Sequence, residues 1–421
     1  MSLSKRDSAH IWHPLTQHRT ALPPIGIVKA KGALLWDEEG NEYIDGIASW
    51  YTAMYGHCNK YITAAAHRQM QQLDFVVFTG FTHPPAVQLA EKLLGMLPAN
   101  QKKVFFNDNG STAVEAAIKM ALQFYHNQGE KRDTLIAFEA GFHGDTFGAM
   151  SASGIASYNG PFEDFLLKVE RIPTPQNDNL DEVVNKLQAI LQKNKCAAFL
   201  FEPLVQGAAG MKFHSAAGLA ALIKTCQKAG VLCIADEIMT GFGKTGPNFA
   251  CDKIESKPDI VCLSKALTAG MFPLGITSCT QQVFSAFLGT ATAKGFFHAH
   301  TYSAHPVGCA VALAGLELLN SAKMLKNRTR IEKAHKAFAL KIGHHPKVAG
   351  VRCKGVILAI DLKIETNRYG RMRDTLYNYF IANGVLLRPL GNTVYVLPPY
   401  VITGGQLQKI YSVLLKSFGL F

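Results

Sequence analysis

The chain has 421 residues, of which 48% are hydrophobic, 18% charged and 10% aromatic. This composition is typical of a globular protein with more than one core, and it excludes a disordered tail protein, a collagen-like fibre and a small disulfide-stapled scaffold. The 43 lysines and arginines exceed the 31 aspartates and glutamates by 12 charges, which favours anionic ligands or nonspecific contact with nucleic acid.

Three features of the sequence predict a cytoplasmic protein. The nine cysteines are scattered and form no Cys-x-x-Cys pair, so neither a disulfide framework nor a zinc knuckle is expected. No stretch reaches the roughly 18 uncharged apolar residues of a membrane span. The first seven residues have no apolar core of the signal-peptide kind. We therefore expect a soluble, reduced protein that does not enter a membrane.

The chain opens with a predicted hairpin and continues as an α/β protein. Residues 33–45 predict two short strands about a turn that carries Gly40 and Asn41. From about residue 60 to residue 310, short apolar runs alternate with helical stretches, which favours a mostly parallel sheet flanked by helices. The runs that have the composition of strands buried on both faces are 104–106, 135–138, 197–201, 231–235 and 260–263. Such sheets bind ligands outside the carboxyl ends of their strands, so the residues after each run are the candidate site.

The last part of the chain predicts a smaller α+β domain. A helix is expected over 306–324, followed by a basic stretch over 323–336. Its charged residues are interleaved with apolar ones such as Leu325 and Ile331, so a helix with one solvated side is favoured over a nucleic-acid-binding face. The expected limits are 1–58 for an N-terminal segment that joins the small domain, 59–310 for the large domain and 311–421 for the small domain.

The end of the first run carries a candidate anion site. After 104–106, Gly110 and Ser111 precede a periodic helix, and Thr112 with Glu115 three residues later fits a capping box. Gly110 permits close approach of a ligand to the backbone, and the unpaired N–H groups at a helix N-terminus favour a phosphate. A well-capped helix without a ligand would give the same local sequence.

Aromatic and polar residues follow the next two runs. Phe142 and His143 are flanked by glycines and are suited to stacking on a flat ring, although aromatic residues beside turns more commonly serve packing. Glu202 and Gln206 follow the run after that and are within reach of the same cleft.

A carboxylate and an amine follow the last two runs. Asp236 directly follows the run 231–235. A carboxylate at the end of a buried strand requires a cation or a strong hydrogen-bond donor. Lys265 lies among apolar residues after the run 260–263, where loss of water lowers the pKa of an amine below its ordinary value of about 10.4. An unprotonated amine condenses with a carbonyl to form an imine. The alternative is a lysine whose ammonium reaches solvent at the margin of the sheet.

Together these residues ask for a ligand with a phosphate, a flat ring bearing a basic nitrogen, and an aldehyde, and pyridoxal phosphate has all three. Gly110 and Ser111 would take the phosphate, and Phe142 would stack on the ring. Asp236 would hold the pyridine nitrogen protonated, and Lys265 would form the Schiff base. Because Lys265 and Asp236 are both present, an enzyme is favoured over a non-catalytic binding protein.

Competing motifs fail on their context. Residues 241–246 match the G-x-G-x-x-G spacing of a nicotinamide dehydrogenase, but a proline follows where the helix should continue. The P-loop spacing fails because Ile238 stands where its first glycine is required. No metal is expected, because two histidine pairs have no partner set with a recognised zinc-ligand spacing: His10 with His13, and His298 with His300.

The sequence resembles the class III, omega-type aminotransferases of the pyridoxal-phosphate fold type I superfamily over nearly its whole length. The resemblance runs from the hairpin at 35–45 to the C-terminal domain, and its most specific stretch is the segment 236–246, followed by the Lys265 segment. The resemblance implies a transaminase that works by a ping-pong mechanism, with a large domain around a mostly parallel central sheet and a smaller α+β domain.

The resemblance also implies roles for single residues. Phe142 stands at the ring-stacking position, which is usually tyrosine. Thr301 matches a threonine that reaches the cofactor phosphate from the other subunit, which implies a homodimer with shared sites. Trp50, Asp145 and Arg388 match substrate-contacting positions, and Arg388 is suited to the carboxylate of an oxo acid.

Within the class, the motifs are most similar to enzymes of biotin synthesis that convert 8-amino-7-oxononanoate to 7,8-diaminononanoate, with S-adenosylmethionine as amino donor. The stretches that carry this similarity are 11–14, 49–50, 142–151, 388–389 and 397–400. Leu15 stands where a substrate-holding tyrosine is common, Lys244 where arginine is common, and Leu390 where an aromatic residue is common. Because Leu15 departs from the pattern, lysine, a diamine or an omega-amino acid stay open as alternative donors.

Overall fold

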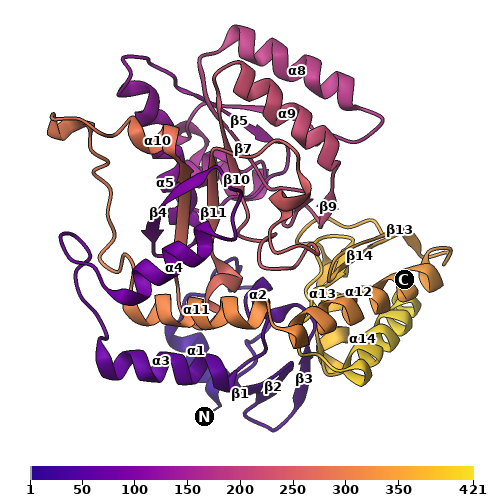
Figure 1. Cartoon of the computed structure of the whole chain (residues 1–421). Helices are drawn as coiled ribbons and strands as arrows, with labels where there is room; N and C mark the ends of the chain where they lie inside the picture. The colour runs from indigo at the N-terminus through magenta and orange to yellow at the C-terminus, as the bar shows by residue number, and fades with distance from the viewer. Residues whose placement is uncertain (1) are drawn as a thin grey trace.

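The computed structural model describes residues 2–421, and its central element is a seven-stranded sheet (Figure 1). The strand order is β4-β12-β11-β10-β7-β5-β6, and among these seven strands β12 alone runs antiparallel to its neighbours. The strands are β4 (Gln101–Asn107), β5 (Thr134–Phe138), β6 (Val169–Ile172), β7 (Cys196–Phe201), β10 (Leu232–Asp236), β11 (Ile260–Leu263) and β12 (Gly275–Thr280). Each predicted apolar run falls on a strand, and the predicted α/β class is confirmed.

The strand β12 was missed by the sequence analysis because polar residues interrupt it. All of its side chains are nevertheless buried. The hydroxyl of Thr277 donates to the carbonyl oxygen of Ala113 at 2.7 Å, and the hydroxyl of Ser278 donates to Oε1 of Gln101 at 2.7 Å. These bonds satisfy the buried hydroxyl groups, so a strand with a polar sequence lies inside the sheet.

Side chains of the central strands alternate between two helical layers. In β5, Leu135 and Ala137 pack in a cluster with α5 (Gly110–His126). The intervening Ile136 and Phe138 pack in another cluster on the opposite face. The helices of that opposite face are α8 (Leu180–Lys193) and α9 (Ala216–Lys228). Because successive side chains of a strand point to opposite faces, a strand covered on both sides needs a continuous apolar run.

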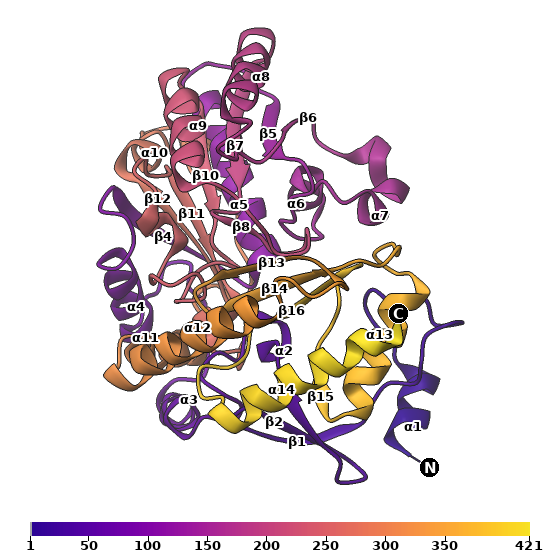
Figure 2. The same ribbon diagram turned by 90° about the vertical axis from the view of Figure 1, so that its right-hand side faces the viewer.

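The two ends of the chain meet beside this sheet (Figure 2). The C-terminal strand β15 runs parallel to the N-terminal strand β3, with Val385 opposite Ile44. The antiparallel pairing of β2 with β3 confirms the predicted hairpin. The two sheets of this region contain β1 (Ile27–Lys31), β2 (Leu34–Asp37), β3 (Glu42–Asp45) and β15 (Val385–Leu386), and β13 (Val348–Lys354), β14 (Ile357–Leu362) and β16 (Thr393–Val396). The domain limits 1–58, 59–310 and 311–421 stay a prediction.

The helix expected over 306–324 ends earlier than predicted. The helix α11 (Pro306–Leu319) stops, and α12 (Ala322–Ile342) begins after Ser321, whose hydroxyl accepts from the N–H of Met324 at 3.3 Å. Serine is a strong helix N-cap, which explains the break. The remaining helices are α1 (Leu3–His10), α2 (Ala48–Tyr51), α3 (Lys60–Gln72), α4 (Pro84–Leu94), α6 (Phe147–Ala152), α7 (Ala156–Asn159), α10 (Gln281–Ser285), α13 (Arg371–Ala382) and α14 (Gly404–Ser417), and a short β8 (Val205–Gln206) pairs with β9 (Lys212–Phe213).

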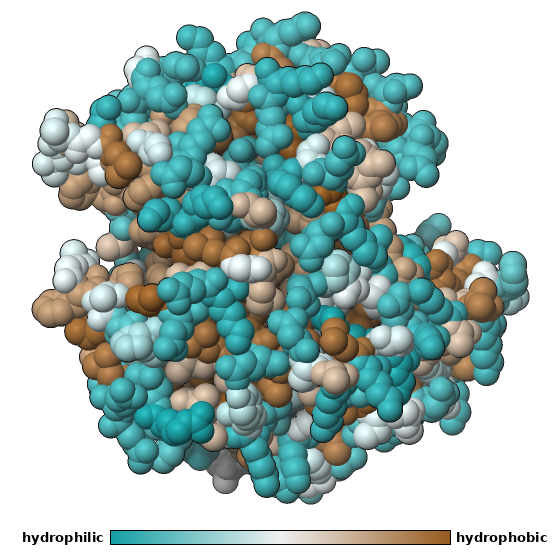
Figure 3. All heavy atoms as spheres, in the orientation of Figure 1, coloured by the Kyte–Doolittle hydropathy of each residue, from teal (hydrophilic) through white to brown (hydrophobic). Residues whose placement is uncertain are grey.

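The helices of residues 2–421 were compared with the length and hydropathy of a membrane span. Within residues 2–421, no single helix is long and apolar enough to cross a bilayer, and α11 with α12 meets the length and composition requirement only as a pair bent by 66°. Figure 3 shows hydrophilic side chains over most of the outer edge of one face, with hydrophobic side chains gathered nearer its middle.

Candidate active site

A cavity of about 340 Å³ lies at the carboxyl ends of β4, β5, β7, β10 and β11, where the rule for parallel sheets predicts a ligand. Residues from the N-terminal segment and from the C-terminal region close its other side. The predicted site residues that line it are Trp50, Gly110, Ser111, Phe142, Asp145, Asp236, Lys265 and Arg388. Thr301 does not line it and lies exposed on the segment before α11.

Asp236 ends β10 with a side chain that is 4% exposed. Its Oδ1 accepts from the N–H of Ile238 at 3.0 Å, and its Oδ2 lies 2.8 Å from Nδ1 of His143. The imidazole is thus the strong donor that a buried carboxylate requires. The other ring nitrogen of His143, Nε2, is buried and has no hydrogen-bond partner within residues 2–421.

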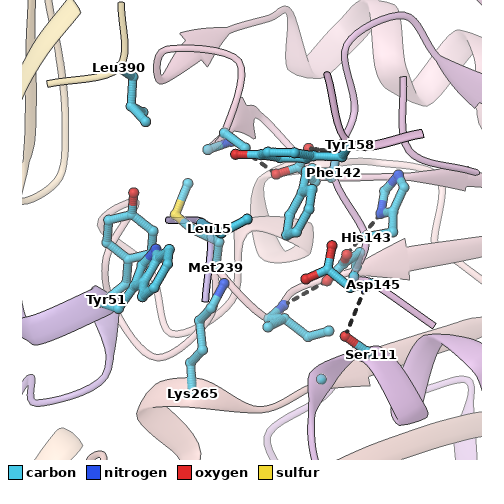
Figure 4. A pocket seen from close by; sticks show the side chains of 18 of the residues that line it. Leu15, Tyr51, Ser111, Phe142, His143, Asp145, Tyr158, Met239, Lys265 and Leu390 are labelled. Carbon is cyan, nitrogen blue, oxygen red and sulfur yellow. Dashed lines mark hydrogen bonds and ion pairs between the residues drawn. The ribbon is translucent and has the colours of Figure 1, made fainter. Parts of the chain in front are cut away.

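Lys265 directly follows β11 and begins the 3-10 helix η3 (Lys265–Thr268). Its backbone φ of 51° lies in the left-handed region, which is strained for a residue with a side chain. Burial lowers the pKa of its amine, against the opposing negative charges of Asp236 and Glu202. Figure 4 shows the side chain pointing into the cavity between Tyr51 and Phe142, and Nζ lies 5.5 Å from the centroid of the Tyr51 ring. The amine therefore faces the cavity and not the outer margin of the sheet.

The N-terminus of α5 differs from the predicted capping box, which was wrong by one turn. Asn109 is the N-cap: its side chain accepts from the N–H of Thr112 at 3.0 Å, and the hydroxyl of Thr112 accepts from the N–H of Asn109 at 3.0 Å. Glu115, expected to complete a box with Thr112, instead accepts from the hydroxyl of Thr146 at 2.6 Å. Asparagine caps helices as well as serine does, so Gly110 becomes the first helical residue.

The same helix end fits a phosphate. The N–H groups of Gly110 and Ser111 have no hydrogen-bond partner in residues 2–421, and both residues line the cavity. The N–H of Asp145 donates to Oγ of Ser111 at 3.3 Å. A Cβ on Gly144 would lie 2.3 Å from that oxygen, so glycine is required for the chain to pass this closely. Free N–H groups and the positive end of a 17-residue helix form a ready anion site.

The position of Phe142 is set by a buried carboxylate. The N–H of Phe142 donates to Oε2 of Glu202 at 3.1 Å, and the N–H of Gly207 donates to Oε1 at 2.9 Å. Burial raises the pKa of Glu202 to about 7. Glu202 lines the cavity, as its place after a strand predicted. Gln206 does not: its amide group donates to the carbonyl oxygen of Glu139 at 2.9 Å.

The cavity wall also contains residues that the sequence analysis missed. The hydroxyl of Tyr51 donates to that of Tyr395 at 3.0 Å, although 344 residues separate the two in sequence. The guanidinium of Arg388 lies 5.1 Å from the ring centroid of Trp50. No local pattern marks these partners, because the fold alone brings them together. The missed cavity residues with charged or aromatic side chains include Tyr51, Tyr158, Arg368, Arg373 and Tyr395.

The residues 241–246 form a turn and do not begin a helix, so they are not a dinucleotide-binding loop. Lys244 in this turn is fully buried, and its Nζ donates to the carbonyl oxygen of Gly241 at 3.0 Å. Burial, and next the positive charge of Lys265, lower the pKa of Lys244 to about 7, against the opposing charge of Glu237.

This buried amine predicts a stability that depends on pH. Between pH 7 and about 10.5 the unfolded chain binds a proton on Lys244 that the folded chain does not, so stability rises with pH across that window. We expect Lys244→Met to be more stable than wild type at pH 6, by about 1 to 4 kcal/mol, with the gap closing towards pH 10. Melting temperatures across this pH range check it, with the exposed Lys224→Met as control. A gap that widens with pH would contradict the assignment.

Three histidines of the two pairs have polar contacts within the protein. Nε2 of His298 lies 3.1 Å from Nε2 of His300, and Nζ of Lys119 lies 2.9 Å from Nδ1 of His298. Nε2 of His13 lies 2.6 Å from a carboxylate oxygen of Asp7. Within residues 2–421, no three histidine, cysteine, aspartate or glutamate side chains are arranged to hold a metal ion.

Comparison with known proteins places this site in a family. The family model described as aminotransferase class III matches residues 16–418. The chain is 43% identical to the adenosylmethionine-8-amino-7-oxononanoate aminotransferase of Synechococcus elongatus over 416 residues, covering 96% of this chain and 97% of the relative. It is 37% identical to the protein of the same name from Geobacter sulfurreducens, covering 98% of this chain and 96% of the relative.

Solved structures agree with the sequence relatives. An adenosylmethionine-8-amino-7-oxononanoate aminotransferase from Methanocaldococcus jannaschii superposes with a TM-score of 0.92 at 31% identity, covering 99% of this chain and 98% of the other. An omega transaminase from Pseudomonas jessenii, solved in complex with PMP, superposes with a TM-score of 0.93 at 27% identity, covering 100% and 98%. The fold is therefore the fold type I architecture that the sequence predicted, and the cofactor is pyridoxal phosphate, for which the cavity has a free helix N-terminus, an aromatic wall, a buried carboxylate and a buried amine. This chain belongs to the class III aminotransferases, the pyridoxal-phosphate-dependent transaminases that its sequence resembles.

Proposed function

We propose that this protein transfers an amino group to the oxo carbon of 8-amino-7-oxononanoate, giving 7,8-diaminononanoate for biotin synthesis, with S-adenosylmethionine as donor. The observation that carries the proposal is that Lys265, Asp236 and Arg388 line one cavity although they lie far apart in the sequence. Relatives named for this substrate pair support it, because they match nearly the full chain at 31 to 43% identity.

The proposed cofactor contacts divide among four parts of the chain. Gly110 and Ser111 hold the phosphate through their free N–H groups, and the partner subunit's Thr301 adds a hydroxyl. Phe142 packs on the ring, and Asp236 keeps the ring nitrogen protonated. When bound, pyridoxal phosphate supplies an aldehyde carbon that takes up the amino group and a ring that withdraws electrons.

Lys265 is the proposed proton carrier. With its pKa lowered by burial, Nζ is unprotonated more readily at neutral pH than an exposed amine, and it removes the proton from the reacting carbon of the donor. In the acceptor half-reaction the same Nζ returns a proton to the carbon that receives the amino group. Asp236, oriented by His143 and by the N–H of Ile238, keeps its negative charge aimed into the cavity throughout.

Arg388 is proposed to bind the carboxylate of the oxo acid, beside Trp50 and Asp145 as further substrate contacts. Guanidinium groups bind carboxylates through paired, charge-assisted hydrogen bonds. We expect Arg388→Ala to raise KM for the oxo acid about 10- to 100-fold with a smaller change in kcat. Steady-state kinetics with product detection by mass spectrometry measure it, and an unchanged KM would refute the assignment.

The donor is tested by a panel of half-reactions. Purified holoenzyme is mixed in turn with S-adenosylmethionine, lysine, a diamine and an omega-amino acid, and the cofactor absorbance is followed. After each donor, 8-amino-7-oxononanoate is added and 7,8-diaminononanoate is measured. Product with S-adenosylmethionine supports the proposal. Product with lysine, a diamine or an omega-amino acid but not with S-adenosylmethionine would make the alternative correct, and Leu15, which lines the cavity where a tyrosine is common, is then the residue to exchange.

We further propose that the protein works in the cytoplasm as a homodimer with shared sites. Thr301 is exposed and away from the cavity of its own chain, as a residue that serves a partner must be. Large apolar side chains on the same and neighbouring segments are also exposed, among them Phe81 at 62% and Phe297 at 74%. Sedimentation velocity on the holoenzyme tests the dimer, and a monomer at micromolar concentration would refute it.

A further inference from the structure

We propose that Arg368 is a second carboxylate-binding arginine of this cavity, which acts beside Arg388 to select substrates with an acidic chain. The inference rests on the proposed function and deepens it, because it adds a residue that determines specificity and names the substrate group, a carboxylate, that this residue binds.

Arg368 is held rigidly at the cavity wall. It lies in the loop between β14 and α13, and it contacts residues far away in sequence. Its Nε donates to the hydroxyl of Tyr158 at 3.0 Å, and its Nη1 donates to the carbonyl oxygen of Ala208 at 2.7 Å. The guanidinium also lies 5.2 Å from the ring centroid of Tyr158. Tyr369 adds to this anchor, because its hydroxyl donates to that of Tyr158 at 2.8 Å. The positive charge is therefore fixed in place before any ligand arrives.

Within residues 2–421, this fixed charge has no counter-ion. A guanidinium carries five N–H donors, and in the described part of the chain acceptors contact two nitrogens of Arg368 and none of Arg388. Within residues 2–421, no aspartate or glutamate oxygen lies within ion-pair distance of either guanidinium. Two half-buried cations with free donors in one cavity are suited to an anionic ligand.

Both guanidinium groups line the one cavity that Tyr51 and Tyr395 also line. Burial raises the pKa of the hydroxyls of Tyr51 and Tyr395, and the positive charges of both Arg368 and Arg388 oppose that rise. The hydroxyl of Tyr51 donates to that of Tyr395 at 3.0 Å, which leaves the hydrogen of the Tyr395 hydroxyl without an acceptor within residues 2–421. A carboxylate in this cavity is offered two cations and the hydroxyl of Tyr395.

A third arginine of the cavity wall, unlike the other two, has a carboxylate counter-ion in the protein. Arg373 also lines the cavity, but its Nη1 lies 2.6 Å from a carboxylate oxygen of the adjacent Asp374. Its charge is neutralised on the protein, which leaves Arg368 and Arg388 as the pair available to a ligand.

The test uses nonanoate, which has the carbon chain of the proposed acceptor without its amino and oxo groups, and its neutral counterpart nonanamide. Binding of each to the pyridoxal-phosphate holoenzyme is measured by calorimetry, with no donor present and no turnover. We expect Arg368→Ala to weaken nonanoate about 10- to 100-fold and nonanamide by less than about 3-fold. The matched control is Arg371→Ala, which removes an exposed arginine three residues further along that does not line the cavity, and which we expect to change neither by more than about 2-fold.

Other outcomes overturn the inference. Equal weakening of nonanoate and nonanamide by Arg368→Ala would mean that Arg368 only braces the wall, and the same holds if wild type does not prefer the carboxylate. Arg368→Gln replaces the alanine variant if the latter is unstable. If holoenzyme fails to aminate 8-amino-7-oxononanoate while nonanoate binding still depends on Arg368, the acceptor is wrong and the carboxylate site stands.

Discussion

Replacing Lys265 by alanine is expected to lower turnover by about 10⁴-fold or more. The cavity places Nζ of Lys265 beside the Tyr51 ring, and burial lowers its pKa, so it is suited to exchange protons with a substrate carbon. A positioned acid–base group contributes about 10²- to 10⁴-fold, and loss of the covalent route through the amine adds to that deficit. Product formation with the donor that the panel identifies, followed by mass spectrometry over hours, measures the residual rate.

A covalent readout separates loss of chemistry from loss of folding. After borohydride treatment of the holoenzyme, wild type should keep the mass of the cofactor on the peptide that contains Lys265, and the variant should not. Lys224→Ala, which removes an exposed lysine of α9, should behave as wild type in both measurements. Turnover above about 1% of wild type in Lys265→Ala would mean that another group moves the proton.

The central sheet was predictable because its strands are covered on both faces. In β7 and β11 every side chain is buried, and this requirement leaves an uninterrupted apolar run in the sequence. The strand β12 is equally buried but carries hydroxyl groups whose partners, such as the carbonyl oxygen of Ala113, come from elsewhere in the fold. A hydrophobicity pattern cannot predict the burial of a polar side chain whose hydrogen-bond partner is distant in the sequence.

The candidate site was predictable to the extent that it lies on strand ends. Carboxyl ends of parallel strands share one edge of a sheet, so Phe142, Asp236 and Lys265 had to lie near one another once the runs before them were strands. The rule does not predict which of these side chains bond to each other. The contact between Nδ1 of His143 and Asp236 depends on the order of β5, β7 and β10 in the sheet. The left-handed backbone of Lys265 also leaves no mark, because lysine has no preference for that conformation.

Other residues of the cavity could not be predicted from the sequence, for a different reason. Tyr51 and Tyr395 belong to opposite ends of the chain and meet because the terminal segments fold together. Arg368 lies in a loop, where neither a hydrophobic periodicity nor the end of a predicted strand indicates a functional residue. Arg388 was identified only through resemblance, whereas Arg368 is identified only by its lack of a counter-ion among residues 2–421 of the folded protein.

Asp236→Asn is expected to slow the donor half-reaction about 10²- to 10³-fold, as removal of one preorganised charge from an active site does. Asparagine keeps the shape of aspartate, and its oxygen can still accept from the N–H of Ile238. The substitution removes the negative charge that we propose keeps the ring nitrogen of the cofactor protonated. It also sets an NH₂ group against Nδ1 of His143, so the imidazole must move its proton to Nε2, where no acceptor lies within residues 2–421.

Stopped-flow absorbance of the cofactor in a single turnover with excess donor measures this rate without product release. Asp259→Asn is the control, because Asp259 is a half-buried carboxylate beside the opposite end of β11 and accepts from the N–H of Cys233 at 2.8 Å. Both variants remove a carboxylate charge that accepts from a backbone N–H at an end of the same sheet, and only Asp236→Asn should slow the half-reaction. A rate for Asp236→Asn within about 3-fold of wild type would show that the charge of Asp236 does not assist proton removal from the donor, and the role assigned to this residue would then reduce to holding His143.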